Sequence, residues 1–189
     1  GAQGAGTTET GSYTLFTSGS STTNMSGRTS SGWVIPSENE WYKAAHYQPA
    51  TSGGPADSFW LYPTQSDGAP SNDLIDPDPG NNANYYQDNG YTLGSPKYLS
   101  DVGAFENSQS YYGTFDQGGN TWEWTEARVL RGGDWVVPEN FLRSTERLAF
   151  DPSAENNEFG FRVAIPEPGA FVALALAGLA ACAWSRRHR

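Results

Sequence analysis

The residues between 111 and 135 carry most of the information about the fold of this chain. Tyr111 to Glu126 reads YYGTFDQGGNTWEWTE, and Val129 to Trp135 reads VLRGGDW. Aromatic residues stand there between glycine pairs, which is typical of short strands joined by tight turns. The segment therefore predicts an irregular α+β domain with little regular secondary structure, not a doubly wound sheet.

The whole chain is acidic and rich in turn-forming residues. Its 189 residues include 22 glycines and 12 prolines, and the formal net charge is −10. Because three of the 11 basic residues lie in the last four positions, the rest of the chain is more acidic still. Such a body repels the phosphate backbone, so we expect no nucleic-acid partner. Glycine and proline exclude a coiled coil, and the many aromatic residues exclude wholesale disorder.

Cysteine and histidine are scarce. The single cysteine, Cys182, lies in an apolar tail, and His46 is the one histidine before residue 188. This excludes a disulfide, a thiol nucleophile and a cysteine-based zinc site in the body, and it also excludes a metal site with two histidines from one chain. Any catalysis by the body would use carboxylates, tyrosine, lysine or arginine.

Local signals predict one helix and a few strands. Ser37 followed by Glu40 forms a capping box, so we predict a helix at about residues 38–47. Residues 13–16 and 159–164 have strand character. Residues 48–84 are mostly loop, and a compact domain tolerates so long a loop when ligands or ions organise it.

The end of the chain has the pattern of a membrane segment. Pro166-Glu167-Pro168 precedes an uncharged, apolar stretch that is followed by arginines. We expect a short hydrophobic helix whose membrane-facing residues include Gly169, Phe171, Leu174, Leu176, Leu179 and Trp184.

These three features in this order resemble the bacterial PEP-CTERM sorting signal. The resemblance implies export, at least transient anchoring in the inner membrane, processing by an exosortase-type enzyme, and a final place at the cell surface or in the extracellular matrix. The beginning of the chain shows no export signal, so we expect a fragment that starts inside its domain.

Five ordered motifs in the body are similar to those of the formylglycine-generating enzyme, or sulfatase-modifying factor, family. They are Trp33 to Trp41, Gly119 to Trp124, Arg128 to Trp135, Arg143 to Arg147 and Gly160 to Ala164. The resemblance implies a domain over residues 1–165 with the family's C-type-lectin-like fold, whose first elements precede residue 1, and a sorting and membrane segment over residues 166–189.

The family's catalytic residues are not matched. Active members use two cysteines after the Arg-Gly-Gly motif to bind copper, and these positions fall on Val137 and Leu142. Neither side chain binds a metal. A related branch uses a histidine-bound iron, which His46 alone does not supply. We expect neither copper nor iron, and no catalytic residue is assigned.

The family's structural calcium is a better match. By position, one site would use Asp116, the carbonyls of Gly119 and Thr121, and Glu123. A second would use Asn84 and the carbonyl of Tyr85. Calcium prefers such mixtures of carboxylates and carbonyls. For Asp116 and Glu123 the competing interpretation is an ordinary solvated turn.

Two further groups of residues have alternative roles. Arg131, Arg143, Arg147 and Arg162 either form an anion-binding cluster or, as we favour, pair with carboxylates inside a loop-rich core. The tryptophans either stack on sugar rings or, as we favour for most of them, fill the core. The set is Trp33, Trp60, Trp122, Trp124 and Trp135.

Three hypotheses follow for function. The first is an exported, surface-associated, calcium-stabilised and non-catalytic module that binds a glycan, a peptide or a matrix component. The second is an oxidoreductase of the same family that uses groups outside this fragment. The third is a degenerate remnant without a stable fold.

Overall fold

The computed structural model describes residues 12–18, 22–26, 28, 32–88 and 90–166, which form two compact units. The first unit combines the chain up to Val34 with the chain from Val163 onward, and the second is Ile35–Arg162. Within the predicted sorting motif, Glu167 and Pro168 lie outside the described residues, as does the predicted membrane segment from Gly169 to Trp184. Among the residues described, no helix has the length and apolar character needed to cross a membrane.

The described part of the first unit is built from extended backbone. Strands β1 (Thr14–Ser18) and β2 (Thr22–Ser26) pair in antiparallel fashion. Val34 and Ala164 exchange two backbone hydrogen bonds of 2.8 Å. The strand predicted at residues 13–16 is confirmed. It begins one residue later than predicted, at Thr14, and ends at Ser18.

The second unit begins with helix α1 (Glu38–His46), which confirms the helix predicted from the capping box. The Ser37 hydroxyl accepts a hydrogen bond from the Glu40 N–H (3.3 Å), and the Glu40 carboxylate accepts one from the Ser37 N–H (2.8 Å). Two of the free N–H groups at the helix start are thereby satisfied. The helix ends before Tyr47, whose backbone is extended.

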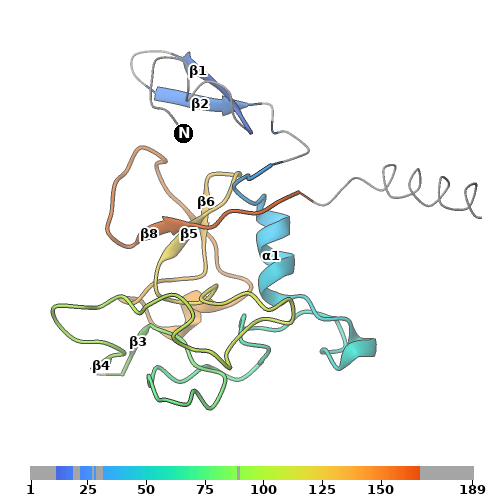
Figure 1. Cartoon of the computed structure of the whole chain (residues 1–189), viewed down its shortest axis with the longest axis vertical. Helices are drawn as coiled ribbons and strands as arrows, with labels where there is room; N and C mark the ends of the chain where they lie inside the picture. Colours follow the sequence, from blue (N-terminus) through green and yellow to red (C-terminus); the bar gives the residue numbers. More distant parts are fainter. Residues whose placement is uncertain (1–11, 19–21, 27, 29–31, 89, 167–189) are drawn as a thin grey trace, which may run out of the picture. The chain divides into compact units, whose positions relative to one another are not determined.

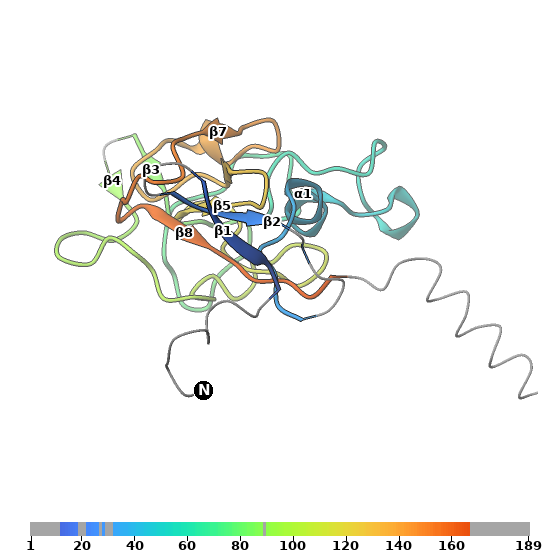
Figure 2. The same ribbon diagram turned by 90° about the horizontal axis from the view of Figure 1, so that it is seen from above.

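A four-stranded sheet lies beside this helix in both views (Figures 1 and 2). Its order is β7 (Leu148–Ala149), β6 (Val129–Arg131), β5 (Trp122–Trp124) and β8 (Phe159–Phe161). Strand β8 runs parallel to β5, and the other neighbours are antiparallel. The strand predicted at 159–164 is therefore shorter than expected and ends at Phe161.

The remaining regular elements of the unit are short. Strands β3 (Tyr86–Gln87) and β4 (Gly90–Tyr91) form a small antiparallel pair, and the two 3₁₀ helices are η1 (Ala50–Ser52) and η2 (Glu139–Leu142). This scarcity agrees with the irregular α+β domain that the glycine and proline content predicts.

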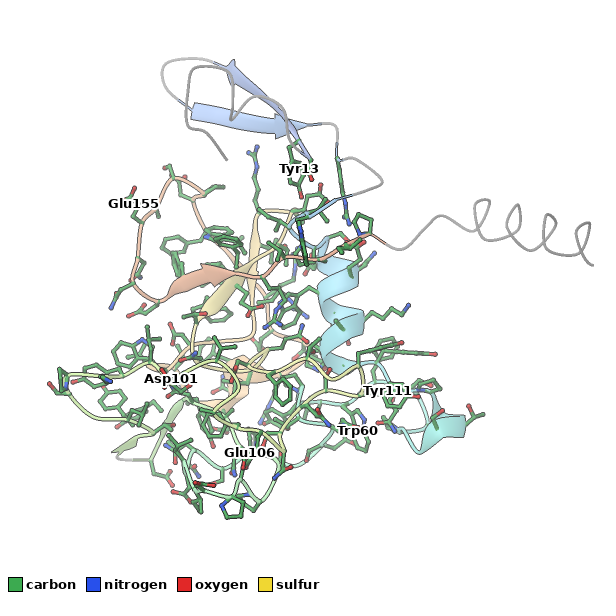
Figure 3. The ribbon with its side chains drawn as sticks, in the orientation of Figure 1. Tyr13, Trp60, Asp101, Glu106, Tyr111 and Glu155 are labelled. Carbon is green, nitrogen blue, oxygen red and sulfur yellow. The ribbon has the colours of Figure 1, made fainter. Side chains whose placement is uncertain are left out.

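Buried hydrogen bonds from side chains organise the long loop. The Asp78 carboxylate accepts hydrogen bonds from the amide group of Asn82 (2.6 Å), the N–H of Asn107 (3.0 Å) and the hydroxyl of Ser108 (2.8 Å). The carboxylate of Glu106, labelled in Figure 3, accepts one from the Asp78 N–H (2.9 Å). Because these bonds join the loop to residues 106–108, polar side chains supply the order that we expected ligands or ions to supply.

The tryptophans are distributed unevenly between core and surface. Trp122 is buried, whereas Trp60, Trp124 and Trp135 are half-buried. Trp33 is 64% exposed and is therefore not a core residue, so Trp122 is the one of the five that is fully buried. Trp33 lies directly before the bridge between Val34 and Ala164, and side chains of successive extended residues point to opposite sides.

Candidate functional site

The two segments predicted to bind calcium lie against each other. Asn84 and Gly119 form a parallel bridge, and the Asn120 N–H donates to the Asn84 carbonyl (2.7 Å). Gly119 has a φ of +79°, and a Cβ atom there would lie 2.2 Å from the Asn84 carbonyl oxygen. Only glycine allows this approach. The glycine pair of the motif thus brings the two predicted sites together.

Asn84 carries an unsatisfied buried oxygen. Its side-chain N–H₂ group donates to the Tyr98 carbonyl (2.9 Å) and to the Asn120 side-chain oxygen (3.0 Å). Its Oδ1 atom is buried and has no hydrogen-bond partner among the described atoms. A buried acceptor without a partner lowers the stability of the fold by about 1–3 kcal/mol, unless an ion or a water molecule binds it. An amide oxygen of this kind is a ligand that calcium accepts.

Glu123 is already bound by protein groups. Arg162 approaches both carboxylate oxygens at 2.5 Å, and the indole N–H of Trp41 donates to Oε2 (2.6 Å). The Glu123 side chain is 9% exposed. Calcium bound by this carboxylate would compete with Arg162 for the same oxygens.

Three more of the predicted ligands, Asp116 and the carbonyls of Gly119 and Tyr85, also have protein partners. Asp116 accepts a hydrogen bond from the Gly103 N–H (2.6 Å), and burial raises the pKa of its carboxyl against the opposing effects of that bond and of the Arg162 charge. The Gly119 carbonyl accepts from the Thr121 N–H (2.8 Å). The Tyr85 carbonyl accepts from the Asn72 side chain (3.2 Å). In the described residues, no three side chains of Asp, Glu, His or Cys gather where they could hold a metal ion.

The residues at the family's cysteine positions belong to an apolar cluster. Leu142 is 1% exposed and packs with Tyr62, Ala83 and Tyr85, and Val137 is half-buried against the same cluster. Burial of the apolar surface of these side chains stabilises the fold. The two residues that the resemblance places at the family's cysteine positions therefore lie in or against the core.

Asp134 is a buried carboxyl that the sequence did not single out. It lies in the Gly-Gly-Asp-Trp segment, and its Oδ1 atom accepts from the N–H groups of Val136 (2.9 Å) and Val137 (3.1 Å). Burial raises its pKa to about 6. Aspartate side chains often accept from the backbone N–H two residues on, so an aspartate directly after the Gly132-Gly133 pair is the signal that would have predicted this turn.

The arginines are committed mainly to structural contacts. Arg162 pairs with Glu123, Arg147 pairs with Glu38 at 3.0 Å, and Arg131 lies 3.9 Å from Glu38. Arg143 donates instead to the hydroxyl of Tyr62 (3.0 Å). These contacts confirm Arg–carboxylate pairing for three of the four residues.

An aromatic groove opens beside the exposed side of α1. Its cavity measures about 430 Å³ and is lined by Asn39, Tyr42, Lys43, Tyr47, Phe59 and Tyr112. The neighbouring residues Trp60 and Tyr111 lie near the C-terminal end of α1 in Figure 3. Sequence reasoning missed this groove because its walls come from the helix, the loop after it and a distant loop.

His46 supports one wall of the groove. Its ring lies 5.1 Å from that of Tyr42, and its Nδ1 atom is 3.1 Å from the Trp60 carbonyl, so Nδ1 carries the proton. Burial, with a smaller effect of the Arg131 charge, lowers its pKa to about 3. The ring is therefore neutral at physiological pH and acts as a packing group.

Comparison with known families identifies the domain. Residues 8–166 match the sulfatase-modifying factor enzyme 1-like domain. The chain belongs to the sulfatase-modifying factor family. The mixed helix and strand content of the described residues, with few helices and irregular sheets, is consistent with this assignment.

Two curated relatives of the family match part of the chain. The protein named inactive C-alpha-formylglycine-generating enzyme 2 is 36% identical in Mus musculus and 35% identical in Bos taurus, over 80 residues in each case. Each match covers 35% of this chain and 26% of the relative. The chain thus spans about a quarter of the length of these curated relatives.

Among solved structures, the Treponema denticola variable protein 1 matches with a TM-score of 0.36 and 18% identity. That match covers 70% of this chain and 47% of the other.

Proposed function

We propose that this sulfatase-modifying factor domain is a non-catalytic binding module. The observation that carries the proposal is the apolar cluster that contains Leu142 and contacts Val137, because the motif resemblance places these residues where active members have their two cysteines. A leucine and a valine neither bind copper nor exchange with a substrate thiol. The relatives whose names call them inactive support the same interpretation.

Calcium is proposed as a structural ion of the module. The unsatisfied Asn84 oxygen fits a calcium ligand, and the adjoining Tyr85 carbonyl is the second protein group that we propose for this ion. At the other proposed site, formed by Asp116, Gly119, Thr121 and Glu123, calcium would compete with Arg162. Calcium supplies charge that satisfies buried oxygens, and the chain supplies the amide and carbonyl oxygens.

The place of action is proposed from the end of the sequence. The apolar stretch after Pro166-Glu167-Pro168, closed by arginines, supports export, an inner-membrane stage and processing by an exosortase-type enzyme. A module delivered in this way would act at the cell surface or in the extracellular matrix, where glycans and peptides are available as ligands.

A metal inventory tests this function. The complete natural protein is purified without chelators, and its metals are counted by mass spectrometry. Near-stoichiometric calcium without copper or iron is expected. Stoichiometric copper or iron would overturn the proposal and favour an oxidoreductase whose catalytic groups lie outside this chain. If the protein contains no metal and neither calcium nor a chelator changes its melting temperature, calcium is removed from the proposal.

A further inference from the structure

We propose that an exposed apolar face formed by Trp33, Val163 and Ile165 rests on the surface of a lipid bilayer. We call these three residues the bridge face, because they flank the backbone bridge between Val34 and Ala164 in the first unit. The inference rests on the proposed inner-membrane stage, and it adds a second membrane contact that the folded part of the chain makes.

The bridge determines the direction of the three side chains. Val34 and Ala164 are antiparallel partners that exchange two backbone hydrogen bonds of 2.8 Å. Because side chains alternate along extended backbone, Trp33 and Ile165 lie across from each other, on the face opposite to the Val34 side chain. Val163 is two residues before Ile165 and points to the same side. The three side chains therefore share one face.

The bridge face is apolar and yet open to solvent. The exposed fractions are 64% for Trp33, 52% for Val163 and 61% for Ile165, whereas Val34 on the opposite face is 1% exposed. A single exposed apolar side chain is ordinary on a protein surface. Neighbouring ones that include a tryptophan are typical of an interaction surface.

The sequence that follows the bridge face indicates what covers it. Ile165 precedes Pro166-Glu167-Pro168, and an uncharged stretch of 16 residues then runs from Gly169 to Trp184. Gly169 is four residues after Ile165, which corresponds to at most about 14 Å of extended chain. When the apolar stretch enters a bilayer, as proposed, the bridge face is held within that distance of the bilayer surface.

The apolar stretch is also short for the membrane that it is proposed to enter. As a helix, its 16 residues would span about 24 Å, whereas the hydrocarbon core of a bilayer is about 30 Å thick. A short span draws the residues that flank it toward the bilayer. Val163 and Ile165 are apolar residues on that flank, and Trp33 belongs to the residue type that prefers the membrane–water interface.

Charge does not explain such a contact. The chain has 21 acidic and 11 basic residues, and three of the basic ones lie in the last four positions, after the apolar stretch. The acidic part before that stretch is repelled by anionic lipids. The contact therefore depends on burial of apolar surface, and it should persist at high salt.

A second copy of the chain is the main competing occupant, since a symmetric dimer would also cover an apolar face. A dimer gives no reason for the face to lie directly before the apolar stretch. A bilayer contact explains both the apolar character of the face and its place in the sequence, which is why we favour it.

Fluorescence quenching by lipids, measured on the full chain, tests the proposal. Cys182 is the single cysteine, so Cys182→Ser combined with Val163→Cys places one environment-sensitive fluorophore on the bridge face. The labelled chain is reconstituted into phosphatidylcholine vesicles that contain a phosphatidylcholine with a nitroxide near its headgroup. A face buried about 5–10 Å into the boundary of the bilayer brings the fluorophore to the nitroxide, so about half or more of the emission should be lost. The loss should be equal at low and high salt.

Matched controls are available on the same chain. Val102 is an exposed valine of the second unit, so a fluorophore at Val102→Cys should keep its emission. In the chain labelled at position 163, Trp33→Ser should reduce the quenching about twofold or more, because the interfacial tryptophan is lost. Tyr91→Ser changes an exposed aromatic ring of the second unit and should leave the quenching unchanged. Equal melting temperatures establish that the variants are folded, and Ile165→Cys replaces Val163→Cys if the latter does not fold.

A fluorophore at Leu176→Cys, in the middle of the apolar stretch, separates this inference from the proposed function. If a nitroxide deep in the bilayer quenches that fluorophore while the one at position 163 keeps its emission, the membrane stage stands and the bridge face is not a membrane contact. If neither fluorophore is quenched, the membrane stage fails and this inference fails with it. A fluorophore at position 163 that is shielded from water but not quenched by lipid would assign the face to a second copy. Quenching that disappears at high salt would show an electrostatic contact, and either result would overturn the proposal.

Discussion

Asn84 and Asn120, 36 residues apart in the chain, are joined by two hydrogen bonds, one between their side chains and one between their backbones. The Asn120 side-chain oxygen also accepts from the Ser100 N–H (3.0 Å), so three loops meet at these two amides. The arrangement leaves the Asn84 side-chain oxygen without a protein partner. This oxygen is where an ion would contribute most.

Replacing Asn84 should therefore abolish the response to calcium. If calcium binds the parent protein as proposed, calcium at one hundred times its dissociation constant should add about 2.7 kcal/mol to the free energy of unfolding and raise Tm by about 5–10 °C. Asn84→Ala should lower Tm and make it indifferent to calcium and chelator. Asn82→Ala is the control, because Asn82 is another buried amide in the same loop but bonds to Asp78. A calcium response that survives in Asn84→Ala would exclude this oxygen as a ligand.

Truncating Leu142 should destabilise the domain strongly. Leu142→Ala removes a side chain that is 1% exposed and leaves a cavity beside Tyr62 and Tyr85, at a cost of about 2–5 kcal/mol. Leu99→Ala is the control, since Leu99 is 44% exposed and should change stability by about 0.5 kcal/mol or less. Urea unfolding gives both values. Equal costs would mean that the family's cysteine position is not part of the core.

Asp134 should make the domain less stable as the pH rises through the weakly acidic range. Its pKa is about 6 in the folded chain against an ordinary value of 3.8, so the folded state holds the proton more tightly. The free energy of unfolding then falls between about pH 4 and pH 6, by at most about 3 kcal/mol.

Asp134→Asn should remove this dependence. The amide oxygen can still accept from the Val136 and Val137 N–H groups, but the side chain no longer ionises. The variant should gain stability relative to the parent at pH 7 and show little difference from it at pH 4. The measurement is urea unfolding at several pH values, and a parallel pH profile for parent and variant would contradict the assignment.

Removing the charge of one partner in the Glu123–Arg162 pair should destabilise the domain. Glu123→Gln keeps the shape and an acceptor for Trp41 but leaves the Arg162 charge without its carboxylate, at a cost of about 3 kcal/mol. Glu155→Gln changes an exposed carboxylate and should have a negligible effect. A double-mutant cycle with Arg162→Gln separates the pair from its surroundings, and a coupling energy near zero would show that the two charges do not depend on each other.

Short-range features were predictable from the sequence. Helix α1 follows from Ser37 and Glu40, because a capping box acts between residues three apart. The scarcity of regular structure follows from the glycine and proline content, and the family follows from five motifs whose order is a property of the sequence alone. The sequence also shows valine and leucine at positions 137 and 142, where the resemblance places the family's cysteines.

Long-range features were decided by the path of the chain. The groove joins Tyr42 on α1 to Phe59 and Tyr112, and the Asp78 carboxylate joins the long loop to Ser108. No local signal links such positions, because side-chain patterns report contacts between neighbours, whereas these pairs meet only after the turns have formed.

The sequence by itself determined the family, the capped helix and the loss of the cysteine pair. Tertiary structure alone decided that Glu123 faces Arg162, that Asn84 keeps an unsatisfied oxygen and that Leu142 is core. The physical reason is that composition and spacing determine what a residue can do locally, while burial and the nearest opposite charge depend on segments that fold against it from far along the chain.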